Sequence, residues 1–255
     1  MSRLQIPNHE RILVALDVPT VGEAATLVER LKGKVGGFKI GPVLMYEIDG
    51  ARFASELAMR GLKVMLDPKL HDVPDTVGPA MAKIVRDISA HFVTVHGSGG
   101  RKMVAAGAEA IKAKGSPLNI LGITVLTSLD KDECREIYGR WLETAVPHFA
   151  MLAKMGGAKG LVCSPRDLPL LRNKDFDDMI RVTPGIRPPW AAARTQKRFT
   201  TPGQALLEGS DYLVIGSPIY DPPPLIDTPE KAVESIVREM EEPTPLPEPA
   251  PEATA

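Results

Sequence analysis

Residues 11–17, RILVALD, set the pattern that decides the fold of this 255-residue chain. The stretch is a short, continuous apolar run that ends in an ionisable residue. Seven further runs follow it, and each ends in a polar, ionisable or glycine residue: residues 37–41, 62–67, 91–97, 119–127, 160–164, 180–185 and 212–217. Successive ends lie 21 to 37 residues apart, which is about the length of one strand plus one helix.

The segments between these runs have the spacing of amphipathic helices. Residues 20–31 are typical, because Ala24, Leu27, Val28 and Leu31 recur near helical spacing and Thr20 precedes them as a candidate N-cap. The other expected helices are residues 43–60, 76–88, 100–114, 141–155 and 229–240.

Continuous apolar strands are typical of parallel sheets that are buried on both faces. Eight strand-and-helix units within about 240 residues match a closed (β/α)8 TIM barrel, which is the predicted fold class. A doubly wound open sheet is the alternative, but it usually has fewer strands, and no GxGxxG follows the first run. We therefore expect a single barrel domain over residues 1–240. Residues 241–255 are acidic and rich in proline, which predicts a disordered tail.

Composition excludes several classes of protein. The chain has 31 Lys and Arg against 32 Asp and Glu, so no basic excess favours nucleic acid or an acidic membrane surface. No uncharged stretch is long and apolar enough to span a bilayer. Two cysteines, Cys134 and Cys163, make no disulfide framework, so the cytoplasm is the expected location. No cluster has metal-ligand spacing, so no metal is expected.

The densest group of chemical side chains follows the third run, in LDPKLHDVPDT at residues 66–76. Alternation along an extended chain puts Asp67 and Lys69 on the same face. Lys39 lies within the apolar second run and needs carboxylate partners such as Asp17 or Asp67. In a barrel these strand ends share one rim, where active sites of this fold lie. Taken alone, the charges fit either a structural ion-pair network or an active site.

Several motifs in order along the chain resemble those of the orotidine 5'-phosphate decarboxylase family. They are ALDV at 15–18, FKIG at 38–41, DPKLHDVPDTV at 67–77, VHGSGG at 95–100, LTS at 126–128, VCSP at 162–165, VTPGIRP at 182–188, QKRFTTP at 196–202 and GSDYLVIG at 209–216. The resemblance covers most of the chain. It implies decarboxylation of orotidine 5'-phosphate to UMP without a metal or other cofactor.

The same resemblance assigns roles to individual residues. It implies a catalytic array of Lys39, Asp67, Lys69 and Asp72, in which Lys69 stabilises a carbanion at C6 of the pyrimidine and protonates it. It places Asp72 and Thr76 in the active site of a second subunit, so a homodimer is expected. The remaining expected substrate-binding residues are Asp17, Thr127, Ser128, Pro184, Arg187, Gln196, Gly216 and Ser217.

The expected phosphate end lies in residues 184–203, a stretch with four basic residues and no acidic one. It has the features of a loop that closes over an anion, and the resemblance makes Arg187 and Gln196 phosphate ligands. One position departs from the family, which usually has arginine where this chain has Ser217. The expected cost is about 1.5 to 3 kcal/mol of phosphate binding unless another cation, such as Arg194 or Arg198, compensates.

Two alternative functions stay open at this point. Related sugar-phosphate decarboxylases and hexulose-phosphate synthases share the Asp-x-Lys-x-x-Asp pattern but bind magnesium, and they typically have glutamate where this chain has Lys39. A non-catalytic nucleotide-binding barrel is suggested only by Ser217.

Overall fold

The computed structural model describes residues 6–191 and 199–242 and shows eight parallel strands that close into a barrel in chain order. Each strand pairs with the next, and β1 pairs with β8. The strands are β1 (Ile12–Ala15), β2 (Gly37–Ile40), β3 (Val64–Leu70), β4 (Phe92–His96), β5 (Asn119–Ile123), β6 (Gly160–Val162), β7 (Ile180–Thr183) and β8 (Tyr212–Ile215). The predicted TIM barrel is confirmed, and the alternative of an open sheet is wrong.

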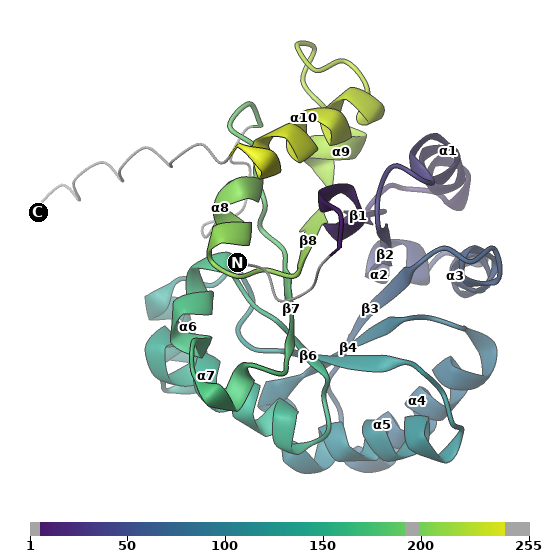
Figure 1. Cartoon of the computed structure of the whole chain (residues 1–255). Coiled ribbons are helices and arrows are strands. Elements are labelled where there is room, and N and C mark those ends of the chain that lie inside the picture. The colour runs from purple at the N-terminus through teal and green to yellow at the C-terminus, as the bar shows by residue number, and fades with distance from the viewer. Residues whose placement is uncertain (1–5, 192–198, 243–255) are drawn as a thin grey trace, which may run out of the picture.

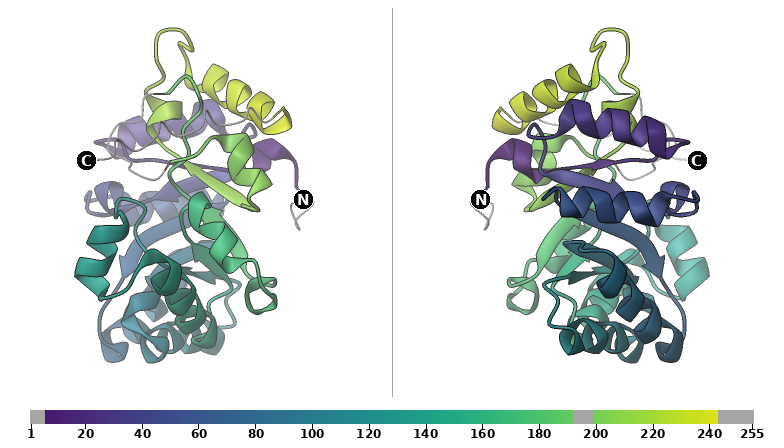
Figure 2. Two further views of the ribbon diagram at one scale, coloured as in Figure 1. Left: turned by 90° about the vertical axis from the view of Figure 1, so that its left-hand side faces the viewer. Right: turned by 90° about the vertical axis from the view of Figure 1, so that its right-hand side faces the viewer.

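Helices surround the barrel on its outside, as Figures 1 and 2 show. They are α1 (Val21–Leu31), α2 (Pro42–Met45), α3 (Gly50–Met59), α4 (Pro74–Asp87), α5 (Arg101–Ala113), α6 (Lys131–Tyr138), α7 (Leu142–Met155), α8 (Pro202–Leu207), α9 (Ser217–Tyr220) and α10 (Pro229–Glu241). Short 3-10 helices lie at Asn8–Arg11, Gly97–Gly99, Pro165–Leu171 and Lys174–Phe176. Thr20 is the N-cap of α1, as expected, because its side chain accepts from the backbone N–H of Glu23.

The core has two parts because the strands are buried on both faces. The larger part fills the space between the strands and the helices. The smaller part fills the inside of the barrel and consists of Leu13, Ala15, Met65, Phe92, Leu121, Val182, Tyr212 and Val214. The inside of the barrel is therefore a packed core of side chains and not an open channel.

Three local expectations from the sequence need correction. The helix expected over residues 43–60 is two helices, α2 and α3, because the chain turns at residues 46–49 and Gly50 packs directly against the Leu44 carbonyl. The third strand continues past Asp67 to Leu70, and the fifth ends at Ile123, before Thr127. Helices α6, α8 and α9 were not expected. Residues 243–255 of the predicted tail lie outside the described residues, and α10 extends to Glu241.

Candidate active site

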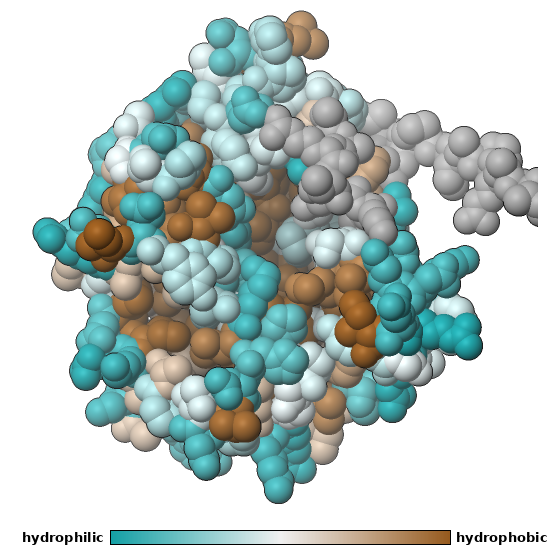
Figure 3. Space-filling model, turned by 180° about the vertical axis from the view of Figure 1, so that it is seen from behind, coloured by the Kyte–Doolittle hydropathy of each residue, from teal (hydrophilic) through white to brown (hydrophobic). Residues whose placement is uncertain are grey.

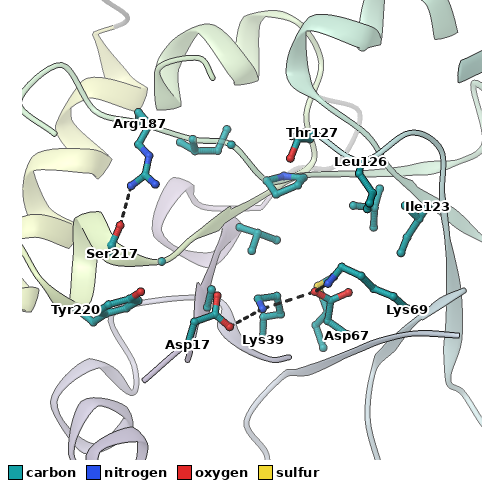
Figure 4. A pocket seen from close by; sticks show the side chains of 18 of the residues that line it. Asp17, Lys39, Asp67, Lys69, Ile123, Leu126, Thr127, Arg187, Ser217 and Tyr220 are labelled. Carbon is teal, nitrogen blue, oxygen red and sulfur yellow. Dashed lines mark hydrogen bonds and ion pairs between the residues drawn. The ribbon is translucent and has the colours of Figure 1, made fainter. Parts of the chain in front are cut away.

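A cavity of about 280 Å³ lies at the carboxyl ends of the strands, where seven of the eight strands or their following loops contribute side chains. Figure 4 shows charged groups from distant parts of the chain facing one another across it. The expected site residues that line it are Asp17, Lys39, Asp67, Lys69, Thr127, Pro184, Arg187, Gly216 and Ser217. The barrel rim thus brings together residues that are up to 200 positions apart in the sequence.

Four charged side chains form a continuous row along one side of this cavity (Figure 4). The Lys39 ammonium lies 2.9 Å from Asp17 Oδ1 and 3.6 Å from Asp67 Oδ2. Asp67 Oδ2 also lies 2.6 Å from Lys69 Nζ. Lys39 and Asp67 are 6% and 7% exposed, so the pair between them is shielded from solvent, whereas the side chains of Asp17 and Lys69 are each 37% exposed. The expected pairing of Lys39 with Asp17 and Asp67 is confirmed.

The strand ends explain why these side chains meet. Lys39 and Met65 are partners in the register of β2 and β3, and Asp67 follows two residues after Met65 on the same face. Asp17 follows β1, which pairs with β2 through Ala15 and Lys39. Adjacent parallel strands therefore present these charges side by side.

Arg187 and Ser217 form a polar contact across the cavity from the charged row (Figure 4). Arg187 is 9% exposed, and its Nη1 donates a hydrogen bond of 2.8 Å to Ser217 Oγ. A pair of backbone hydrogen bonds fixes the segment that carries Arg187: its own N–H donates to the Thr200 carbonyl, and the Thr200 N–H donates to the Gly185 carbonyl. The cavity therefore has a row of paired charges at one end and a guanidinium at the other.

Three expected site residues within the described part of the chain do not line this cavity, and a fourth lies outside that part. Asp72, Thr76 and Ser128 are exposed, because each lies in a loop or first helical turn beyond its strand, with its side chain on the solvent side. Asp72 Oδ1 accepts from the Val73 N–H. Gln196 lies outside the described residues, as do the basic residues Arg194, Lys197 and Arg198. The roles of all four site residues stay predictions.

Two residues at this site, Tyr220 and Thr94, are not among those predicted from the sequence. Tyr220, in α9, lines the cavity beside Asp17 (Figure 4). Thr94, in β4, is fully buried and donates a hydrogen bond of 2.8 Å to Asp67 Oδ1. A hydroxyl inside the apolar run HFVTVHG was a visible signal for Thr94. Tyr220 gave no such signal, because it depends on the short helix α9.

His96, at the end of β4, lies near this row without lining the cavity. Its ring stacks on His71 with 5.0 Å between centroids. Burial lowers the pKa of His96 to about 4, and the positive charges of His71 and Lys69 act in the same direction. His96 is therefore neutral at pH 7 and adds no charge to the site.

Neither metal ligation nor a membrane span is found in the described part of the chain. Among residues 6–191 and 199–242, no three His, Cys, Asp or Glu side chains converge in an arrangement that could hold a metal ion. Over the same residues, every helix is too short or too polar to cross a membrane.

The fold and the cavity define a (β/α)8-barrel protein with a row of paired charges at the carboxyl ends of its strands. Residues 10–234 match the Orotidine 5'-phosphate decarboxylase / HUMPS family, and the chain belongs to this family.

Individual relatives agree with this assignment. The chain is 38% identical to the orotidine 5'-phosphate decarboxylase of Syntrophotalea carbinolica, over 93% of this chain and 99% of that protein. It is 41% identical to the enzyme of the same name from Paramagnetospirillum magneticum, over 82% and 90% of the two chains. Among solved structures, orotidine 5'-phosphate decarboxylase from Lactobacillus acidophilus is similar with a TM-score of 0.75 and 31% identity, covering 90% of this chain and 98% of that one.

Proposed function

We propose that this protein decarboxylates orotidine 5'-phosphate to UMP in pyrimidine biosynthesis. The observation that carries the proposal is the row Asp17, Lys39, Asp67 and Lys69, which is joined by ion pairs inside one cavity. Family membership and relatives of the same name that align over nearly their whole length support the same activity.

Loss of CO2 from orotidine 5'-phosphate leaves a carbanion that no conventional electron sink can accept, so the reaction depends on positive charge held beside that carbanion. When the bond from C6 to the carboxylate breaks, the electron pair stays on C6 and CO2 leaves. The Lys69 ammonium stabilises that pair and then gives its proton to C6, after which water returns a proton to Lys69. The side chain of Lys69 is 37% exposed, so its ammonium can reach a ligand in the cavity. Asp67 holds this ammonium beside the reacting atom and Lys39 balances the charge of Asp67.

The phosphate end supplies binding energy away from the reacting carbon. An enzyme of this kind needs on the order of 20 kcal/mol of transition-state stabilisation, far more than one proton transfer provides. Among the described residues that line the cavity, Arg187 is the cation on the side opposite Lys69. We assign it to the 5'-phosphate. The hydroxyl and N–H of Ser217 and the N–H of Gly216 are further donors, and Gln196 completes the proposed set.

At the base end, we assign Thr127 and Ser128 to the edge of the pyrimidine and Asp17 to the ribose. Thr127 and Pro184 line the same cavity as the charged row, which supports this placement.

The activity is tested by following the decay of orotidine 5'-phosphate absorbance with purified protein. The wild type should convert it to UMP, Lys69→Ala should abolish the conversion, and activity should survive EDTA. Equal rates for the wild type and Lys69→Ala would refute the proposal. Loss of activity in EDTA with recovery on added Mg²⁺ would instead favour a magnesium-dependent lyase.

The phosphate assignment is tested at Ser217. The Ser217→Arg variant adds a second guanidinium to the cavity beside that of Arg187. Its kcat/KM should be higher than that of the wild type by about tenfold or more, the value of a charge-assisted hydrogen bond. Arg187→Ala should raise KM. An unchanged kcat/KM for Ser217→Arg would mean that another cation already compensates or that Ser217 does not reach the phosphate.

We further propose that two chains form a homodimer that shares its active sites through Asp72 and Thr76. Both residues follow β3, are exposed, and do not line the cavity of their own chain. Large apolar side chains that follow β2 and β3 are exposed in the single chain: Tyr46 is 89% exposed, Ile48 100% and Val73 59%. Figure 3 shows apolar side chains in several separate places on one face, interspersed with hydrophilic ones. Exposed apolar surface marks interaction sites where it is continuous.

Mixing two inactive variants tests the shared site. In a mixed dimer of Lys69→Ala and Asp72→Ala chains, one site holds Lys69 from one chain and Asp72 from the other. Random reassociation should therefore restore about a quarter of wild-type activity if Asp72 crosses the interface. If Asp72 serves its own chain, both sites stay defective and no activity returns. Sedimentation equilibrium measures the dimer directly.

We also propose that the enzyme works in the cytoplasm. Its two cysteines, Cys134 and Cys163, are both buried and are not joined by a disulfide, which fits a reducing compartment. Fractionation of cells that produce the protein would test this location.

A further inference from the structure

Thr94 joins two catalytic elements of the site without lining the cavity. It lies in β4 with no exposed surface. Its Oγ1 donates a hydrogen bond of 2.8 Å to Asp67 Oδ1 and accepts one of 3.0 Å from the Lys69 N–H. One hydroxyl thus contacts the carboxylate of one proposed catalytic residue and the backbone of the other.

The backbone around Lys69 is irregular and needs such a partner. Lys69 has a φ of 50°, a left-handed conformation that costs about 1–3 kcal/mol for a residue with a side chain. The pairing of β3 with β4 is regular at Leu66 and Val93 but shifts before Leu70, which pairs with Val95. Lys69 lies inside this irregular stretch, so its N–H bonds to the Thr94 hydroxyl.

The orientation of the Asp67 carboxylate depends on the same hydroxyl. The single proton of Thr94 is directed to Oδ1. Oδ2 is therefore the oxygen that faces both lysines, at 2.6 Å from Lys69 Nζ and 3.6 Å from Lys39 Nζ. Without the hydroxyl, Oδ1 would be buried without this donor, and the carboxylate could rotate away from the ammonium groups.

We propose that Thr94 is a positioning residue for decarboxylation, which fixes the Asp67 carboxylate and the left-handed turn at Lys69 in one geometry. The inference rests on the proposed function, because it assigns Thr94 a role through the Asp67 and Lys69 pair. Thr94 contacts the groups that act on the substrate and not the substrate itself, so it acts on kcat more than on KM.

Two substitutions at position 94 separate positioning from packing. Thr94→Val keeps the shape of the side chain and removes the hydroxyl. It should lower kcat by about 10- to 150-fold, the value of a hydrogen bond to a charged group. KM should change by less than about threefold, because the phosphate and base contacts stay in place. Thr94→Ser restores the hydroxyl and should recover most of the wild-type kcat.

Thr183→Val is the matched control. Thr183 is also a fully buried threonine in a strand, and its Oγ1 lies 2.8 Å from Ser210 Oγ. Its replacement should lower thermal stability by an amount similar to Thr94→Val but leave kcat unchanged. A wild-type kcat in Thr94→Val would overturn the proposal, as would an equal loss of kcat in Thr94→Ser or in Thr183→Val.

Crystal structures of the wild type and Thr94→Val give a readout that does not depend on activity. The variant should show a rotated Asp67 carboxylate or an altered φ at Lys69. Unchanged geometry at both residues would refute positioning by Thr94. A wild type that is inactive on orotidine 5'-phosphate would refute the proposed function instead, and the structural comparison would still decide the role of Thr94 in holding the pair.

Discussion

Replacing Gly41 by alanine should separate Lys39 from Asp17 while the barrel stays folded. Gly41 follows β2 and precedes α2, with a φ of −99° that alanine adopts without strain. A Cβ at this position would lie 2.7 Å from Lys39 Nζ and 3.3 Å from Asp17 Oδ1. Ordinary contact begins at 3.4 Å, so the ammonium must move by at least 0.7 Å. The end of a lysine side chain can make that move without disturbing the backbone.

The movement breaks the hydrogen bond of 2.9 Å between Lys39 and Asp17. A hydrogen bond to a charged group contributes about 1.5–3 kcal/mol. If the transition state depends on the whole row, kcat/KM for orotidine 5'-phosphate should fall by about 10- to 150-fold, since 1.36 kcal/mol corresponds to a factor of ten. Initial rates from the loss of substrate absorbance measure this effect, and thermal denaturation should show a stable fold.

Gly22→Ala provides the control, because Gly22 lies exposed in α1 and its added Cβ would be no closer than 3.9 Å to Thr20 Oγ1. This variant should keep the wild-type kcat/KM. If Gly41→Ala were as active as Gly22→Ala, contact between Lys39 and Asp17 would not matter for catalysis, and the importance of an intact row would be refuted.

Three further predictions concern stability. Burial lowers the pKa of His96 from 6.5 to about 4, so as the pH falls the unfolded chain binds a proton at this position before the folded chain does. The free energy of unfolding should therefore be unaffected by His96 above pH 6.5 and lower by about 2 kcal/mol at pH 5. Urea denaturation should show a smaller decrease between these pH values in His96→Gln. Burial raises the pKa of the Glu239 carboxyl group, although this group accepts a hydrogen bond from the Gly203 N–H. The folded state therefore becomes less stable as the pH rises and Glu239 becomes charged. Glu239→Gln should therefore raise the urea midpoint more at pH 7 than at pH 4, and an equal change would contradict this. Lys39→Met should destabilise the fold by about 1.5–3 kcal/mol, the value of its hydrogen bond to Asp17, and Asp17 and Asp67 would then face each other without the cation between them. Lys69→Met should cost less, because the Lys69 side chain is more exposed; calorimetry would reveal a reversed order.

The sequence predicts the barrel well because its signals are local and repeated. Each run, such as residues 11–17, is mostly apolar, and eight such runs leave few alternative folds. The boundaries are less predictable. The break between α2 and α3 depends on the close packing of Gly50 on Leu44, and the extension of β3 to Leu70 depends on pairing with Val95 in the neighbouring strand. Such contacts between separate segments have no signature in a single run of residues.

The charged row could be predicted in part for the same reason. Lys39 is an ammonium group inside an apolar strand, so burial alone requires a carboxylate partner, and the barrel order limits the choice to neighbouring strands. Thr94 is visible in the sequence only as a hydroxyl within an apolar run, because its importance arises from the left-handed backbone at Lys69, which the sequence LDPKL does not specify. The contact between Arg187 and Ser217 spans 30 residues and depends on how the loop after β7 folds back over α9.

The two lysines of the row have different tasks, and burial distinguishes them. The Lys39 side chain is 8% exposed and lies between the carboxylates of Asp17 and Asp67, which would otherwise repel each other. The Lys69 side chain is 37% exposed and has one carboxylate partner among the described residues, Asp67. A proton donor must reach the reacting carbon, so Lys69 fits that role and Lys39 fits the role of a fixed counter-charge. Because both lysines are held by carboxylates of the protein, little reorganisation is needed when negative charge develops on the substrate.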